Sequence, residues 1–160
     1  MAVDIFLVLN GIDGESEDKV YKDKIDVLAW SWGLSQSGTM HMGKGGGAGK
    51  ANFQDISVTK YVDKSSATLM NKIAKGEHII DGKIVVRKAG GDPLEYFVVE
   101  MKEIMVTSYS TGGSGGEERL TENITLNFAK VKSTYKTQGD DGGDGAEVEF
   151  KWDIPANTSA

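Results

Sequence analysis

The 160-residue chain has no cysteine, only two prolines and no excess of positive charge. Without cysteine, disulfide bonds, thiolate metal sites and cysteine nucleophiles are excluded. A formal net charge of −6 argues against a general nucleic-acid binder, which needs a basic face against phosphates, and against docking on anionic lipid. No apolar run approaches the roughly 20 residues that a membrane-spanning helix requires. We therefore expect neither nucleic-acid binding nor membrane insertion.

The N-terminus also lacks the features of a signal peptide. Residues Met1 to Asn10 alternate like a strand, with neither a basic start nor a small-residue cleavage site. This predicts a protein that is made and folded in the cytoplasm. The length predicts one domain spanning residues 1–160, with a frayed tail at 156–160.

What the sequence has in abundance is glycine, 21 residues of it, gathered between segments that repeat every two residues. These segments predict strands, and one stretch, Ser66 to Lys75, predicts the single helix. Asp63 and Ser65 offer oxygens for its start, Gly76 suits its end, and Leu69, Met70 and Ile73 form its apolar stripe. The strands are expected at Val3–Leu9, Ile25–Gln36, Phe53–Val62, Ile79–Lys88, Leu94–Ser110, Arg119–Thr137 and around Val148–Ile154. We predict an all-β fold, a closed or nearly closed β-barrel of antiparallel strands flanked by one short α-helix.

The predicted strand Ile25–Gln36 has two unlike faces. Bulky side chains of one face are expected to anchor the core: Leu28, Trp30, Trp32 and Leu34. Small side chains occupy the other face, at Val27, Ala29, Ser31, Gly33 and Ser35. An ordinary solvent face would carry Lys, Glu or Thr, so the small face is a candidate contact or channel surface. Core packing is the favoured interpretation of Trp30 and Trp32, over a pair that stacks on a ligand.

The glycine-rich segment Gly38 to Lys50 has no periodicity and predicts a long exposed loop. A phosphate-binding loop is the alternative, but Lys44 stands where the motif needs glycine and Ala51 where it needs Ser or Thr. Gly43, Gly45 and Ala48 match a loose dinucleotide pattern, yet no βαβ unit surrounds them. The segment is therefore interpreted as a flexible contact loop.

No set of residues assembles a nucleophile, a base and an orienting group. His41 and His78 are the only histidines and are interpreted as surface residues. Asp140, Asp141 and Asp144 resemble a calcium loop but lack the EF-hand spacing and its Glu, so a solvated loop is favoured. We predict that the protein is not an enzyme and uses no metal or cofactor.

Several short motifs, in order and at matching spacing, resemble one family. The most specific is the strand that contains Trp30-Ser31-Trp32-Gly33. Others lie along nearly the whole chain: Asp4-Ile5-Phe6-Leu7, Gly11-Ile12-Asp13-Gly14-Glu15-Ser16, Phe53, Asp55, Lys60, Asp63, Arg87-Lys88-Ala89-Gly90-Gly91, Leu94-Glu95-Tyr96, Ser110 to Gly116 and Leu126 to Val131. In these motifs the chain resembles the Hcp tube proteins of bacterial type VI secretion systems.

The resemblance implies a phage tail-tube-like barrel that assembles as a hexamer. Rings would stack into a hollow inner tube, which a contractile sheath drives out of the cell with a spike at its tip. The lumen would carry small effector proteins, and the subunit would be exported without a signal peptide. The alternatives are a monomeric secreted effector or binding module, and a small enzyme that uses the glycine loop.

Two groups of residues are assigned roles as hypotheses. Ser31, with Ala29 and Gly33, is expected to face the lumen or a close neighbouring subunit. The loop is expected to reach the adjacent ring and order on stacking, through Met40, His41, Met42, Gly43, Lys44, Gly45, Gly46 and Gly47.

Overall fold

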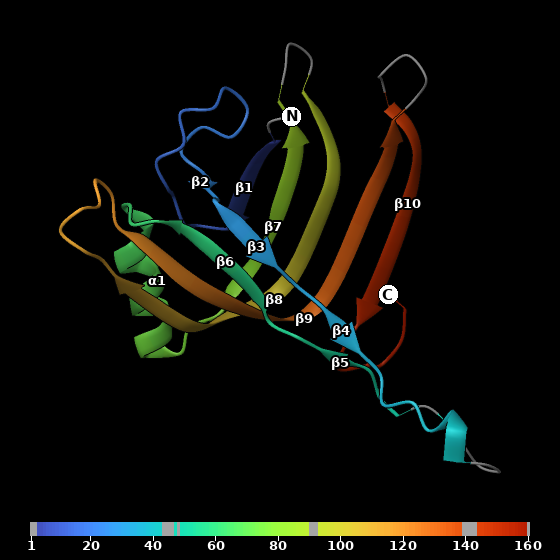
Figure 1. Ribbon diagram of the computed structural model, residues 1–160. Helices are drawn as coiled ribbons and strands as arrows, with labels where there is room; N and C mark the ends of the chain where they lie inside the picture. The colour runs from blue at the N-terminus through green and yellow to red at the C-terminus, as the bar shows by residue number, and fades with distance from the viewer. Residues whose placement is uncertain (1–2, 43–46, 48, 90–92, 139–143, 160) are drawn as a thin grey trace.

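The computed structural model describes residues 3–42, 47, 49–89, 93–138 and 144–159 (Figure 1). Strands dominate these residues, and one α-helix accompanies them, α1 (Ser65–Lys75). The strands are β1 (Val3–Leu9), β2 (Ile25–Asp26), β3 (Ala29–Ser31), β4 (Leu34–Ser35), β5 (Asn52–Phe53), β6 (Ile56–Tyr61), β7 (Ile79–Lys88), β8 (Leu94–Gly112), β9 (Thr121–Gln138) and β10 (Asp144–Asp153). The prediction of a mainly β fold with a single short helix is confirmed. No helix of the described residues has the length and apolar character to cross a membrane.

The main sheet is antiparallel throughout and has the order β2-β1-β7-β8-β9-β6-β3. Strand β9 pairs with three other strands of this sheet. One edge of β9 pairs with β8, while the other pairs with β6 over Thr121 to Leu126 and with β10 over Lys130 to Gln138. The strands β8 and β9 are long and bent, so they run from the part of the sheet beside β6 to the part beside β10 (Figure 1).

The sheet is not closed into a barrel, which corrects the closed form of the prediction. A single segment, residues 25–31, instead bonds both ends of the sheet; we call it the strap. Its first residues pair with β1, and the amide of Val27 donates to the carbonyl of Ile5 at 3.0 Å. The amide of Leu28 then donates to the carbonyl of Thr59 in β6 at 2.8 Å, and β3 continues along β6.

This change of partner breaks the single strand expected over Ile25–Gln36. Alternation is lost at the crossing, so Val27 is buried whereas Leu28 is 45% exposed. Leu34 is also exposed, because it lies in the two-stranded β4–β5 ribbon rather than over the core. The expectation that Leu28 and Leu34 anchor the core is therefore wrong, while Trp30 and Trp32 do pack against it.

The core lies on the concave side of the sheet. It is built from side chains that are fully buried on successive strands, including Leu7, Ile84, Val99, Ile104 and Leu126. Helix α1 closes one end of it through Leu69, which is fully buried, and Ile73, which is partly buried. Met70, expected in the apolar stripe, is exposed.

Both ends of α1 are fixed by the residues around them. At the start, the carboxylate of Asp63 accepts the amide of Ser65 at 2.9 Å, and Ser66 Oγ accepts the amide of Asp63 at 3.0 Å. The oxygen expected from Asp63 is confirmed, but the second comes from Ser66 rather than Ser65. At the end, Gly76 adopts φ +65°, as predicted for a C-terminal cap.

The polar stretch between β1 and β2 folds onto the convex side of the sheet. Tyr21 stacks on Phe6 with ring centroids 4.8 Å apart. Arg87 holds the same loop by hydrogen bonds to Asp18, and it also forms an ion pair with Asp4 of β1. These contacts cover the apolar side chains at one end of the convex face. The loop therefore shields that end of the face from solvent.

Candidate assembly surface

Strand β10 carries apolar side chains on the same sheet face as the core. Its apolar residues Val148, Phe150 and Trp152 alternate with Glu147, Glu149 and Lys151. Val148 lies opposite Tyr135 of β9, which lies opposite Phe97 of β8, so one apolar row runs from the core toward the sheet edge. Trp30 covers this row only as far as Phe97, on which it stacks at 5.9 Å between ring centroids.

Beyond that cover the row is open to solvent. Val148 is 60% exposed and Tyr135 46%, and Phe150, two residues along β10, is 37% exposed. Phe53 of β5 joins Phe150 and Trp152, and the three ring centroids lie 6.3 to 6.5 Å apart. We call Phe53, Tyr135, Val148, Phe150 and Trp152 the β9–β10 apolar face. A contiguous exposed apolar surface of this kind marks a site of association.

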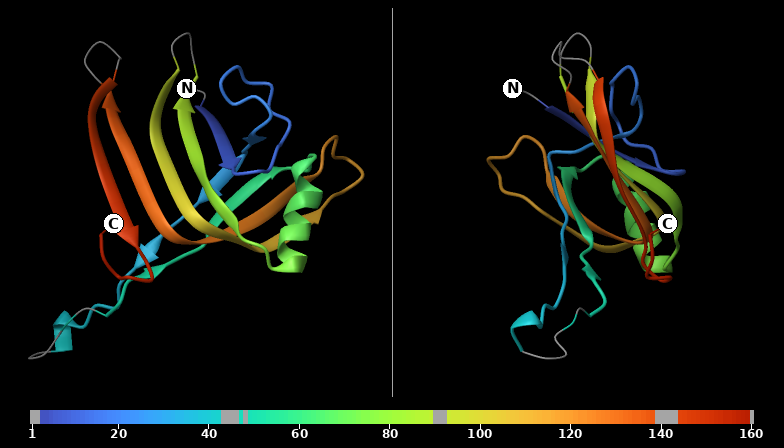
Figure 2. Two further views of the ribbon diagram at one scale, coloured as in Figure 1. Left: turned by 180° about the vertical axis from the view of Figure 1, so that it is seen from behind. Right: turned by 90° about the vertical axis from the view of Figure 1, so that its right-hand side faces the viewer.

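The backbone of β10 points to association as well. Within the part of the chain that the structure describes, β10 pairs with β9 and with no other strand, and at its end Asp153 also bridges to Thr158. Its outer edge therefore presents amide and carbonyl groups that can pair with another strand. Strand β10 lies at one side of the molecule (Figures 1 and 2). The alternation of Val148, Phe150 and Trp152 with charges is visible in the sequence, but the sequence does not show that this face is left uncovered.

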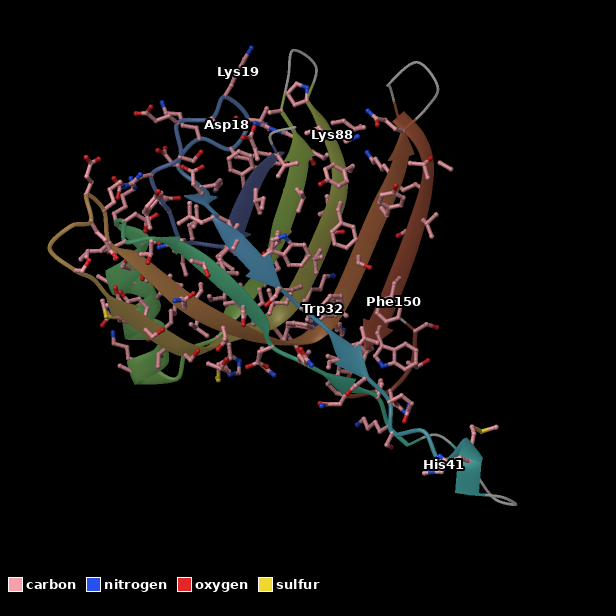
Figure 3. The ribbon with its side chains drawn as sticks, in the orientation of Figure 1. Asp18, Lys19, Trp32, His41, Lys88 and Phe150 are labelled. Carbon is pink, nitrogen blue, oxygen red and sulfur yellow. The ribbon has the colours of Figure 1, made fainter. Side chains whose placement is uncertain are left out.

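Strands β4 and β5 form an arm that projects away from the sheet (Figures 1 and 2). Met40 to Met42 form a 3-10 turn near its tip, contrary to the expectation of no regular structure. Met40 is 80% exposed, and His41 and Gly47 are exposed as well. Figure 3 places His41 far out along the arm, well away from Trp32 and Phe150. Gly43, Lys44, Gly45 and Gly46 lie outside the described residues.

The residues expected at the lumen lie together on and just after β3. Ala29 and Ser31 are exposed and pair with Thr59 and Ser57 of β6. Gly33 is half-buried, and a Cβ placed there would come within 3.1 Å of the Gln54 side-chain oxygen. The lumen role of these three residues remains a prediction.

A buried charged cluster joins the helix to the sheet. The ammonium group of Lys60 lies 2.7 Å from Glu122 Oε1 and 3.0 Å from Asp63 Oδ1, and Ser66 Oγ donates to the same Glu122 oxygen. Burial, then a hydrogen bond to Glu122, raises the pKa of the Tyr109 phenol. The cluster is an internal anchor rather than an open site, since both Lys60 and Glu122 are fully buried.

The described residues contain no group of three or more His, Asp or Glu side chains that could hold a metal ion. His41 and His78 are both exposed, as expected. Asp140 and Asp141 of the acidic loop fall outside the described residues. What the described residues offer is an exposed apolar face beside the edge of β10.

The chain is similar to known proteins over most of its length. The family model described as "Type VI secretion system effector, Hcp" matches residues 6–135. The chain is 55% identical to Protein hcp1 of Pseudomonas aeruginosa, with all of both chains covered. It is also similar to the crystal structure of Hcp1 from Salmonella typhimurium, at 36% identity over all of both chains with a TM-score of 0.83. A solved structure of a type six secretion system protein, 28% identical, gives a TM-score of 0.93 over 99% of this chain and 100% of its own.

Proposed function

Because the chain belongs to the Hcp family of type VI secretion system proteins, we propose that it is a structural subunit of the secretion tube. In this proposal, copies join into hexameric rings and the rings stack into a hollow inner tube. The subunit is made in the cytoplasm and leaves the cell without a signal peptide, with the spike and driven by the sheath. It performs no catalysis and needs no cofactor.

The β9–β10 apolar face is the observation that carries the proposal. A ring requires that one surface of each subunit meets a different surface of the next. The β10 edge and the apolar face lie at one side of the sheet, whereas β1 and the strap lie at the other (Figure 1). That second side has its own exposed apolar residues, Val3 and Leu28. Contact between the two sides would cover apolar area and satisfy the edge of β10.

The inner wall of the ring would be lined by small side chains. Ala29 and Ser31 are exposed on β3, and Gly33 follows them. Short side chains leave the channel wide and present no fixed charge, which suits a lumen that carries effector proteins of different sequence. In this proposal small effectors are the cargo and these three residues face them.

Stacking of the rings would use the arm. It extends away from the sheet (Figure 2). Met40, in the 3-10 turn of the arm, is 80% exposed in the single chain. An exposed apolar side chain on a projecting ribbon gains stability only against a partner. The segment Met40 to Gly47 would therefore contact the adjacent ring.

The test of the proposal is the solution mass of the purified protein, measured by size-exclusion chromatography with light scattering. A ring has six times the 17.2 kDa of one chain and appears as annular particles in electron microscopy. A mass of one chain at every concentration, with no annular particles, would reject the tube subunit. That result would favour a monomeric secreted effector or binding module, in keeping with the word "effector" in the family description.

A further inference from the structure

The face of β7 to β10 opposite the apolar face carries rows of charge. Strand pairing sets one row as Lys83, Glu100, Lys132 and Lys151, and the next row as Asp81, Lys102, Lys130 and Asp153. Side chains of a strand alternate between faces, so these charges point away from the β9–β10 apolar face. We call the five lysines of the two rows the lysine surface: Lys83, Lys102, Lys130, Lys132 and Lys151.

Two pairs of lysines lie directly opposite each other across neighbouring strands. Lys102 faces Lys130, and Lys132 faces Lys151. Like charges in this position destabilise a sheet. Nearby carboxylates compensate in part: Glu149 lies 3.1 Å from Lys132 and Asp153 lies 3.8 Å from Lys130. Among the ion pairs of the described residues, Lys102 takes part in none.

The surface is also hollowed. A concavity of about 540 Å³ is lined by the five lysines together with Val8, Asp81 and Glu100. A hollow with an excess of lysine is unexpected on a chain whose net charge is −6. The isolated fold gains nothing from opposed lysines, whereas an anionic partner seated in the hollow would be attracted by them.

We infer that the lysine surface binds an acidic helix of a partner protein. Lys130 and Lys132 are two residues apart on β9, which separates them by about 6.6 Å along the strand. Glutamates four residues apart on a helix are separated by about 6 Å, so each can meet one lysine. A phosphate backbone carries charge along its whole length, so some of its phosphates would lie against Glu100, Glu149 and Asp81 and be repelled. A helix can place its few carboxylates opposite lysines alone, which favours the helix as the partner. This inference does not depend on the proposed tube function.

The probe is a fluorescent alanine-based helical peptide with Glu at positions i and i+4 along one face, and its matched control has Gln at the same positions. Fluorescence anisotropy at low ionic strength measures binding to the intact protein. We expect the Glu peptide to bind at least about tenfold more tightly than the Gln peptide, with the difference shrinking as salt is added. Equal binding of the two peptides, or no binding of either, overturns the inference.

The decisive variant is Lys102→Gln/Lys151→Gln, which removes one member of each opposed pair. We expect affinity for the Glu peptide to fall about tenfold while the thermal midpoint of unfolding stays equal or rises, since two repulsions are relieved. The control Lys19→Gln/Lys22→Gln removes two exposed lysines of the β1–β2 loop and should leave affinity unchanged. Unchanged affinity in Lys102→Gln/Lys151→Gln would count against the site. A single-stranded DNA that displaces the peptide at lower concentration would assign the surface to phosphate instead and overturn the inference.

Discussion

Lys60 and Glu122 form an ion pair with both side chains 0% exposed. We predict that Lys60→Met lowers the free energy of unfolding by about 3–5 kcal/mol, because Glu122 is left as an uncompensated buried charge. The double variant Lys60→Met/Glu122→Leu should recover much of that loss, since the fully buried carboxylate of Glu122 is removed as well. Urea unfolding measures both. Lys72→Met breaks the solvent-accessible pair with Glu77 and serves as the control, with an expected loss of about 1 kcal/mol or less. A Lys60→Met protein as stable as that control would contradict the prediction.

A second residue-scale effect concerns the loop between β1 and β2. Hydrogen bonds from Arg87 are the main cause that lowers the pKa of Asp18 from 3.8 to about 2. A lowered carboxyl pKa stabilises the fold fully above the unfolded value, and this stabilisation is lost as pH falls from about 4 to about 2. We predict that Asp18→Asn lowers the free energy of unfolding at pH 7 and flattens its dependence on pH between about 4 and 2. Denaturant unfolding across this range measures the slope; a slope as steep as that of exposed Asp13→Asn would speak against it.

The small side chain at position 31 makes a further residue-scale prediction, which rests on the proposed lumen. Ser31 is exposed on β3, so a longer side chain can be accommodated without disturbing the core. We predict that Ser31→Gln leaves the ring mass unchanged but lowers the amount of a cognate effector that co-purifies with the rings. Ser31→Ala keeps the side chain short and should retain the effector. Undiminished retention by Ser31→Gln would refute the assignment.

At the scale of elements, the arm is the part that the single chain uses least. Its tip projects from the sheet, and its exposed Met40 contributes nothing to the core. We predict that deleting Gly43 to Gly49 leaves the mass of single rings unchanged but abolishes their stacking into tubes. Electron microscopy of the concentrated protein counts both forms. Tubes of normal length from the deletion variant would show that the arm is not the stacking element.

Some strands could be predicted from the sequence and others could not. The bounds of β1 and β7 were predicted to the residue. Each strand pairs along its whole length within the sheet, so the residue pattern along the strand marks where it begins and ends. The strap was predicted wrongly, because its change of partner depends on where β1 and β6 lie in space. Leu28 follows the alternation of a strand, but the crossing turns it out to solvent.

The candidate surface could be predicted only in part from the sequence, for a similar reason. The alternation of Val148, Phe150 and Trp152 predicts that they share a face, and they do. Whether such a face is buried depends on the layer that covers it, and Trp30 reaches only Phe97. Ala29, Ser31 and the arm were singled out by residue type alone. The structure shows that they are exposed, and their roles in the lumen and in stacking stay predictions.

At the scale of the whole molecule, the β9–β10 apolar face should decide the oligomeric state. We predict that Phe150→Lys shifts the solution mass from that of a ring to that of one chain. A charge would replace an aromatic contact worth about 2 kcal/mol or more at each interface. Light scattering measures the mass, and circular dichroism checks that the fold is kept.

The matched control for this variant is Val20→Lys. It adds the same charge at an apolar side chain that is 67% exposed, in the loop on the convex side of the sheet. Rings should persist in this control. If Phe150→Lys rings were equally abundant, the contact between subunits would lie elsewhere on the molecule.

The central place of β9 has a consequence for synthesis on the ribosome. Strand β6 emerges early, yet its long partner on one edge is β9, which begins 60 residues after β6 ends. Until then the growing polypeptide has β3 and β6 on one side and β1, β7 and β8 on the other, with no ladder between β6 and β8. Before β9 is translated, the strap joins these two groups of strands, and the ladders that hold β6 and β8 to β9 form only later. A ribosome-bound fragment that stops short of Thr121 lacks both β9 and β10, so in the proposed ring it could not yet supply the β9–β10 apolar face.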